Sequence, residues 1–303
     1  MSLSIFTNAS SMASTNAMNK SNNLLSTAME RLGTGKRINS AADDAAGLQI
    51  ATRLQGQTNG MSVAQRNISD ATALLQTAEG AFDEVSNIMY RMKDLATQAA
   101  NDTNTSKDRT AINSELNELN SELNNIMKNT SYAGDKLFGA SGKFATEMNF
   151  QIGSSTDETM KVNLSDDLKG NASSGLLNAS GAFSDMGKTG GATGTGSYFS
   201  TASGMKISTA SGAKNMITDL ENALNSVGKV RSEMGAKINR LGHTAANLAN
   251  MKDNTDLALS NIRDADYATE ASSMSRNQLL AQTSMSMLKQ SNSMSSMVMS
   301  LLG

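Results

Sequence analysis

Residues 50–99 have the sequence IATRLQGQTNGMSVAQRNISDATALLQTAEGAFDEVSNIMYRMKDLATQA. Apolar side chains recur along this stretch at alternating spacings of four and three residues, interrupted only at Gln57. The positions that share this spacing are Ile50, Leu54, Met61, Ala64, Ile68, Ala71, Leu75, Ala78, Phe82, Val85, Met89, Met92, Ala96 and Ala99. A repeat of about 3.5 residues is typical of a helix whose apolar seam packs against partner helices. The spacing therefore predicts a continuous helix, roughly 75 Å long, with a seam that must be covered.

Candidate partners for this seam lie further along the chain. After a polar break at residues 101–106, the same spacing recurs at Ile112, Leu116, Leu119, Leu123 and Ile126. A third seam comprises Ala213, Ile217, Leu220, Leu224, Val227, Met234, Ile238, Leu241, Ala245, Leu248, Leu259 and Ile262. Because an isolated helix buries none of its apolar face, we expect the second helix to fold back antiparallel on the first. We expect the third helix to pack against both. Ser40 and Asp43, in an S-x-x-D pattern, predict where the first helix starts.

Both ends of the chain are also patterned as helices. The N-terminal apolar positions are Ala17, Leu24, Leu25, Ala28 and Leu32. At the other end, a spacing of seven residues relates Leu280, Met287, Met294 and Leu301, beside Leu288, Val298 and Leu302. Proline, which breaks helix interiors, is absent from the chain. The sequence thus predicts a mainly α fold, in which the N- and C-terminal segments form a long antiparallel helical bundle or coiled coil.

A different pattern lies between the second and third helices. Met148, Phe150 and Ile152 alternate with polar residues, and a turn-forming GSSTDE at 153–158 follows. Alternation then resumes at Met160, Val162 and Leu164. A period of two predicts a small β-hairpin near residues 144–165. Residues 171–212 are dominated by Gly, Ser, Thr and Ala, which predicts a short, surface-exposed insert.

The composition excludes several classes of function. The chain has 303 residues, a net charge of -2 with mixed signs, and no cysteine. No basic stripe favours nucleic acid, and no polybasic run favours a membrane surface. Without cysteine there is no disulfide, thiolate metal site or thiol nucleophile. Residues 1–20 lack the apolar stretch of a cleavable secretory signal, and no apolar run is long enough to span a bilayer.

The residues needed for catalysis are missing as well. The single histidine, His243, lies two residues after Leu241 and off the seam, so we interpret it as a solvated or interface side chain. One histidine cannot supply an HExxH metal motif, and neither a G-x-S-x-G elbow nor a phosphate-binding G-x-x-x-x-G-K-[ST] loop is present. Seam methionines are interpreted as core fillers: Met61, Met89, Met92 and Met234. The sequence favours a protein that is not an enzyme and needs no cofactor or metal.

Two long strings at opposite ends of the chain resemble the signature sequences of bacterial flagellin. They are ERLGTGKRINSAADDAAGLQIATRL at 30–54 and NIRDADYATEASSMSRNQLLAQ at 261–282, with Leu301-Leu302-Gly303 at the end. The resemblance covers roughly residues 1–165 and 213–303, and the short middle is similar to the compact flagellins of lateral flagella.

This resemblance implies a domain organisation. Residues 1–44 and 259–303 would form a terminal helical domain lining the inner tube of a filament. Residues 45–170 and 213–258 would form a helical rod domain around it, with the hairpin. Residues 171–212 would be the variable insert.

The resemblance also implies a life cycle outside the cell. The chain would be secreted by type III export without a cleaved signal and would polymerise with itself into the extracellular flagellar filament for motility. Its partners would be further copies of itself, the flagellin export chaperone, and the filament cap and hook–filament junction proteins. Assembly is assigned to Leu24, Leu32, Leu280, Met287, Met294, Val298 and Leu301. The terminal methionines are expected to pack between subunits: Met285, Met287, Met294, Met297 and Met299.

One patch on the first rod helix is a candidate interface. Arg91, Leu95 and Gln98 lie off the seam of residues 89–99, so Leu95 is predicted to be an apolar residue that points away from its own core. Such a residue indicates a contact with a neighbouring subunit. By resemblance, these residues and Glu115 on the second helix also imply recognition by Toll-like receptor 5.

Two alternative functions remain open from the sequence. A hook–filament junction protein shares flagellin-like ends, although the complete terminal signatures favour flagellin. A secreted adhesin with a coiled-coil stalk would not polymerise and would not need matched seams at both termini.

Overall fold

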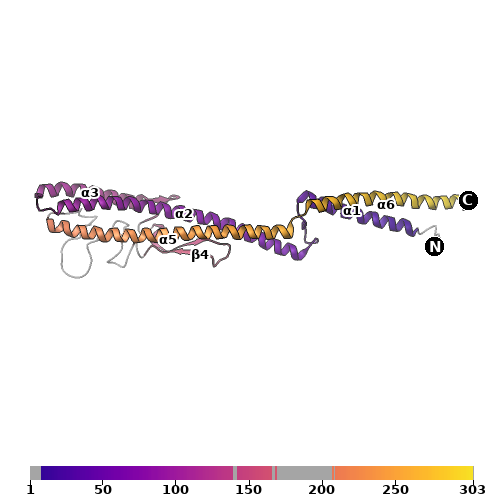
Figure 1. The fold of residues 1–303 in the computed structure, drawn as a ribbon, viewed down its shortest axis with the longest axis horizontal. Helices are drawn as coiled ribbons and strands as arrows, with labels where there is room; N and C mark the ends of the chain where they lie inside the picture. The colour runs from indigo at the N-terminus through magenta and orange to yellow at the C-terminus, as the bar shows by residue number, and fades with distance from the viewer. Residues whose placement is uncertain (1–7, 139–141, 166–167, 169–206, 208, 303) are drawn as a thin grey trace. The chain divides into compact units, whose positions relative to one another are not determined.

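The computed structural model describes residues 8–138, 142–165, 168, 207 and 209–302, with side chains up to residue 294. Its helices are α1 (Ala9–Thr34), α2 (Ala45–Ala99), α3 (Ser106–Asn129), α5 (Ala210–Arg263) and α6 (Tyr267–Leu302), with one short 3-10 helix, η1 (Lys143–Ala145). Two hairpins pair β1 (Ser131–Tyr132) with β2 (Asp135–Lys136) and β3 (Met148–Gln151) with β4 (Thr159–Val162) (Figure 1). The predicted fold class, mainly α with a small β-hairpin, is confirmed.

The chain divides into two compact units. Residues 1–59 and 252–303 form one, here named the terminal unit, and residues 60–251 form the other, the central unit. Both divisions fall inside long helices, because α2 and α5 continue from one unit into the other. The sequence-based domains instead divide at residues 44/45 and 258/259, near the first residue of α2 and the last residues of α5. Most of the predicted insert, 171–212, lies outside the described residues.

In the central unit, α2 is covered by α3 and α5, as its seam predicts. Positions along the α2 seam from Met61 to Ala99 are buried. The chain turns between α2 and α3, and α5 runs antiparallel to α2, since Lys93 pairs with Glu221 and Asp83 pairs with Arg231. The core methionines Met61, Met89, Met92 and Met234 are at most 1% exposed, which confirms their interpretation as fillers. Figure 1 shows the three helices side by side.

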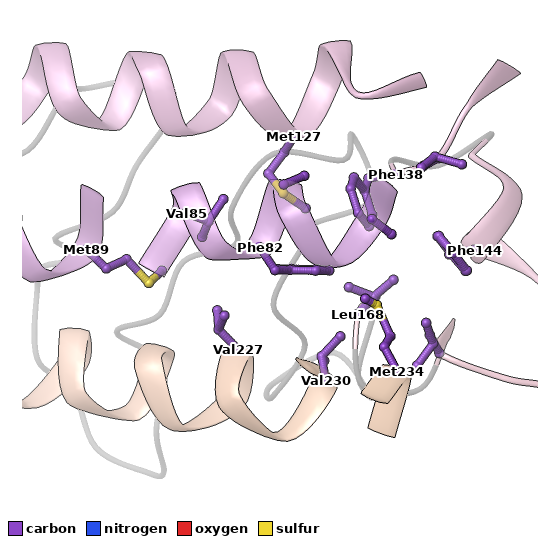
Figure 2. Close-up of a cluster of buried hydrophobic side chains, with 14 of the residues drawn as sticks. Phe82, Val85, Met89, Met127, Phe138, Phe144, Leu168, Val227, Val230 and Met234 are labelled. Carbon is purple, nitrogen blue, oxygen red and sulfur yellow. The ribbon is translucent and has the colours of Figure 1, made fainter. Parts of the chain in front are cut away.

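Part of this core is filled by side chains from helices and loops together. Figure 2 shows Phe82, Val85 and Met89 of α2 facing Met127 of α3 and Val227, Val230 and Met234 of α5. Phe138, from the segment after β2, meets Phe82 edge-on with ring centroids 5.0 Å apart, and stacks on Phe144 of η1 at 5.8 Å. Aromatic pairs at these separations stabilise the fold beyond the area they bury.

The β3–β4 hairpin lies where the sequence predicts it. Phe150 pairs with Met160, and Met148 pairs with Val162. Met160, Val162 and Leu164 are buried in the central core. The hairpin is attached to α2 by a hydrogen bond of 3.2 Å from the Asn67 side chain to the Gln151 carbonyl, so the polar flank of the seam helix positions the strands.

Close contact between α2 and the hairpin turn requires a glycine at position 60. A Cβ added there would lie 2.8 Å from the Cβ of Ser154, whereas one added at Gly80 would meet nothing within 4 Å. Alanine in place of glycine in a helix interior stabilises by up to about 1 kcal/mol. We expect Gly80→Ala to raise the midpoint of thermal unfolding, and Gly60→Ala to leave it unchanged or lower it. Circular dichroism melts of the two matched variants measure the difference; equal increases would contradict the close contact.

The start of α2 differs from the prediction. Asp43 accepts hydrogen bonds from the backbone and hydroxyl of Ser40, but these close a separate turn before the helix. The helix begins at Ala45, and its capping group is the carboxylate of Asp44, which accepts from the amide of Gly47 at 2.8 Å. Two adjacent acids could cap this helix. Asp44 does so because the unpaired amides of the first helical turn are within its reach, whereas Asp43 is hydrogen-bonded to the preceding turn.

In the described part of the chain, none of the helices combines the length and the apolar character needed to cross a bilayer.

Candidate self-assembly surface

Helices α1 and α6 lie side by side and antiparallel in the terminal unit, so the N- and C-terminal helices pair as the sequence predicts (Figure 1). Near one end, the amide of Asn8 donates to the hydroxyl of Ser291 at 2.9 Å. Near the other end, Arg31 forms an ion pair of 3.1 Å with Glu270. These two contacts, more than twenty residues apart on each helix, define the register of the pair.

The interior of this helix pair is small and polar. Its buried side chains are Ser21, Ala28, Asn277 and Ser291. Small side chains allow two helices to approach closely, but they bury little apolar area. Larger apolar side chains of α1 and α6 are at most partly buried, namely Met18, Leu25, Leu32, Met274 and Leu288, and the other large apolar side chains that the structure describes on the two helices are exposed.

Those large apolar side chains lie on the outside. Leu24 is 46% exposed, Leu280 is 47%, Met287 is 58% and Met294 is 54%. Leu32 is only half-buried, because α6 covers part of it. Val298 and Leu301 belong to the helical backbone of α6, but their side chains lie outside the described part. The structure thus places the predicted residues on two neighbouring helices, four of them open to contact.

Sequence reasoning missed further exposed apolar residues on the same helices. Met12 is 60% exposed, Met29 is 52% and Leu279 is 64%. A signal for them was present, because the small residues Ser14, Ser21 and Ala28 follow one another at intervals of seven residues. Such a row of small residues is typical of a close helix contact, and it predicts that the larger residues point elsewhere.

The two signature strings meet at the base of the helix pair. The amide of Arg37 donates to the carbonyl of Arg263 at 2.6 Å, and the amide of Ala265 donates to the carbonyl of Gly35 at 3.0 Å. Gly35 has a φ of 70°, and a Cβ there would lie 3.2 Å from the Tyr267 hydroxyl oxygen. Glycine fits this position because it adopts a positive φ without strain and has no Cβ to contact Tyr267. The strings that are separated by more than 200 residues in sequence therefore form one joint.

At the same joint, Asp266 caps the start of α6. Its carboxylate accepts from the amide of Ala268 at 2.9 Å and from the hydroxyl of Thr269 at 2.8 Å. The Thr269 hydroxyl, followed by the amides of Ala268 and Thr269, holds the pKa of Asp266 below its ordinary value.

Acidification should therefore weaken the first turn of α6. A depressed folded-state pKa means that the ionised Asp266 stabilises the folded state above the unfolded pKa of about 3.9. That contribution is lost as the pH falls through the lower, folded-state pKa. We expect protection factors for the amides of residues 268–270, corrected for intrinsic exchange, to drop below about pH 4. Asp266→Asn keeps an accepting oxygen but cannot titrate, so a drop of equal size in that variant would contradict the assignment.

A second candidate surface lies on the central unit. The guanidinium of Arg91 on α2 reaches Glu115 on α3 at 2.6 Å, and both side chains are about half exposed. Gln98 is exposed on the same helix. The prediction that Leu95 points away from the core is wrong, because this side chain is only 3% exposed. Two helices flank α2 rather than one, so a second row of α2 residues is buried: Leu74, Ala81 and Leu95.

The single histidine of the chain, His243, is exposed on α5.

Comparison with known proteins assigns the N- and C-terminal parts of the chain to one family. Residues 5–143 match the family model of the bacterial flagellin N-terminal helical region, and residues 217–302 match that of the C-terminal helical region. Flagellin B of Vibrio anguillarum is 32% identical over 379 aligned positions that cover 100% of both chains. The chain belongs to the bacterial flagellin family. Polar flagellin C of Vibrio parahaemolyticus serotype O3:K6 (strain RIMD 2210633) is 33% identical over 391 positions, again covering both chains fully.

Flagellins are structural proteins rather than enzymes, and this flagellin is a subunit of the extracellular filament that serves motility. The alignments are longer than the chain itself, so the relatives have residues that this compact flagellin lacks. Its relation to lateral flagellins stays a prediction. A putative flagellar hook-associated protein from Vibrio parahaemolyticus has a similar fold, with a TM-score of 0.56 over 73% of this chain and 100% of that chain at 16% identity.

Proposed function

We propose that the terminal unit carries filament assembly, through the apolar side chains that α1 and α6 leave uncovered. One observation supports this most strongly: the fully buried side chains of the helix pair are small or polar, while many of its large apolar side chains are exposed. A pair that had evolved to remain alone in water would have the opposite arrangement. Burial against neighbouring copies removes this apolar area from water, and contacts that do not close into a ring extend as an open filament.

Seeded growth tests this proposal. Purified monomer is incubated with short filament seeds and viewed by electron microscopy, beside a variant that lacks residues 259–303. We expect long helical filaments from the full chain and none from the truncated one. Soluble monomer or short capped stubs from the full chain would contradict the proposal and favour a junction protein or an adhesin.

Within the filament, residues 1–44 and 259–303 form the inner tube in this proposal, and residues 45–170 and 213–258 form the rod around it. The α6 helix, with its open apolar residues, is also the segment that an export chaperone would cover before assembly. The cap and the hook–filament junction proteins would then bind the two filament ends through surfaces that match those between subunits.

We further propose that the Arg91–Glu115 surface contacts a neighbouring subunit in the filament and Toll-like receptor 5 in the free subunit. Its support is the exposed ion pair, which holds a guanidinium and a carboxylate from two helices beside Gln98. Because Leu95 is buried, it would support the packing of α2 under this surface and would not contact the receptor. Lys93, two residues before Leu95 on α2, is paired with Glu221 of α5 at 2.9 Å.

A receptor reporter assay tests whether the receptor binds this surface rather than a neighbouring one. Arg91→Ala should lower the potency of monomeric flagellin about tenfold, the effect of losing one well-placed charged contact. Lys107→Ala removes an exposed cation from the neighbouring helix α3 and should leave potency unchanged. Equal potency of the two variants would contradict the receptor assignment.

A further inference from the structure

The fully buried methionines that the structure describes all lie in the central unit of this flagellin, whereas all but one of the exposed ones lie in the terminal unit; the exception is Met251, 39% exposed near the end of the central unit. In the central unit, the thioethers that are at most 1% exposed belong to Met61, Met89, Met92, Met127, Met160, Met216 and Met234. In the terminal unit, side chains that are 49–60% exposed belong to Met12, Met29, Met285, Met287 and Met294. Free thioether sulfur is therefore presented to solvent mainly where α1 and α6 leave apolar surface open.

These exposed methionines share the assembly surface with leucines, and the register of the helix pair brings some of them to the same level. Asn8 lies opposite Ser291 and Arg31 opposite Glu270, so Met12 lies at the level of Met287 along the pair. Leu24 and Leu280 provide apolar area of the same kind. Methionine differs from leucine in one chemical respect, since its sulfur is readily oxidised.

We propose that Met12, Met29, Met285, Met287 and Met294 are sulfoxidation sites, whose oxidation in the free subunit by a peroxide stops filament assembly without unfolding the central unit. This inference rests on the proposed role of the terminal unit in assembly.

The reaction is an oxygen transfer with a two-electron oxidant. The lone pair of the thioether sulfur attacks one oxygen of hydrogen peroxide, an S–O bond forms and the O–O bond breaks. The departing hydroxide takes up the remaining proton and leaves as water. The sulfur is oxidised by two electrons to the sulfoxide, and the peroxide is reduced by two.

The consequence for assembly follows from polarity. A sulfoxide is a strong hydrogen-bond acceptor, and burying it in an apolar contact without a donor is unfavourable. In the folded monomer the modified side chains stay in water, so the helices keep their structure. The seven buried methionines of the central unit are shielded by the core and escape the reagent while that unit is folded, whereas Met251 is open to it. We expect the monomer concentration needed for seeded growth to rise at least about tenfold.

Assembly itself should protect these sites. If copies of the chain cover α1 and α6 in the filament, peroxide reaches their sulfur atoms in the monomer but not in the polymer. The oxidation rate of the five methionines thus reports independently on whether these helix faces are covered.

The experiment treats purified full-length monomer and preformed filaments with hydrogen peroxide, quenches the reagent, and maps each sulfoxide by peptide mass spectrometry. Seeded growth and far-UV circular dichroism of the treated monomer follow. A portion is incubated with methionine sulfoxide reductases A and B, which together reduce both sulfoxide epimers. We expect oxidation of the five terminal methionines, loss of growth with retained helicity, and recovery of growth after reduction.

Two variants sharpen the test. In one, the five proposed sites are replaced by leucine together with Met297 and Met299, which are also expected to pack between subunits, and its treated growth is compared with its own untreated growth. In the other, Met61→Leu and Met89→Leu are combined in the central core. We expect peroxide to leave the growth of the first variant at its own untreated level and to block the second variant as it blocks the natural chain.

Three results would overturn the inference: unchanged growth of the oxidised natural chain, no recovery after reductase treatment, or peroxide sensitivity that persists in the leucine variant. Failure of the untreated natural chain to extend seeds would instead overturn the proposed function. Equal oxidation of the five sites in monomer and filament would show that α1 and α6 are not the covered faces, and would overturn both.

Discussion

Replacing Phe82 with alanine should lower the free energy of unfolding of the central unit by about 3–5 kcal/mol. The ring is fully buried and meets Phe138 edge-on at 5.0 Å. Side chains from α2, α3, α5 and the segment around η1 converge on it (Figure 2), so the surroundings cannot collapse from one side to fill the cavity. Denaturant unfolding followed by far-UV circular dichroism measures the loss, with hydrogen exchange of the α2 amides to assign it to this unit.

Tyr90 offers a matched control on the same helix. Its side chain is 57% exposed, and Tyr90→Ala should change the free energy of unfolding by no more than about 0.5 kcal/mol. If the two aromatic substitutions cost the same, the seam of α2 does not form the core of the central unit.

Leu280→Asp should abolish seeded filament growth while the monomer stays folded. The leucine is 47% exposed in the free subunit, so a carboxylate there remains hydrated and costs the monomer little. In the proposed subunit contact the same carboxylate would lose water without gaining a partner, a penalty of several kcal/mol. We expect the concentration needed for growth to increase by about a hundredfold or more.

Electron microscopy of seeded samples and sedimentation of polymer provide the measurement. Gln278→Asp introduces the same charge into α6 at an exposed position that is already polar, and its effect should be much smaller. Normal filaments from Leu280→Asp, or an equal loss from Gln278→Asp, would contradict the assignment of the apolar face. Circular dichroism of both monomers excludes unfolding as the cause.

Much of the central unit could be predicted from local periodicity. The heptad spacing identified the seam that is buried from Met61 to Ala99, although its first predicted position, Ile50, is 41% exposed. The alternation at Met148 and Phe150 located the hairpin. These patterns can be recognised in the sequence because each depends on the geometry of a single element. That geometry repeats every 3.6 residues in a helix and every two residues in a strand. The same reasoning placed Met89 and Met92 in the core.

The candidate sites were predictable only in part. A spacing of seven identified Leu280, Met287 and Met294 as one stripe of α6, and the structure leaves that stripe open. The pattern did not show that α1 and α6 meet through small and polar residues, which is why Met12 and Met29 were missed. Arg91 and Glu115 were named together by resemblance, but their ion pair depends on how α2 and α3 are aligned.

The sequence by itself determined the helices, the hairpin, the paired ends and the flagellin family, because short-range periodicity and long signature strings carry that information. Only the tertiary structure decided which side of each helix is covered. Leu95 is buried because α3 and α5 flank α2 from two directions, while Leu280 is exposed because α6 has a single partner in the terminal unit. Exposure depends on the number and direction of neighbouring helices, and no single helix records that in its own spacing.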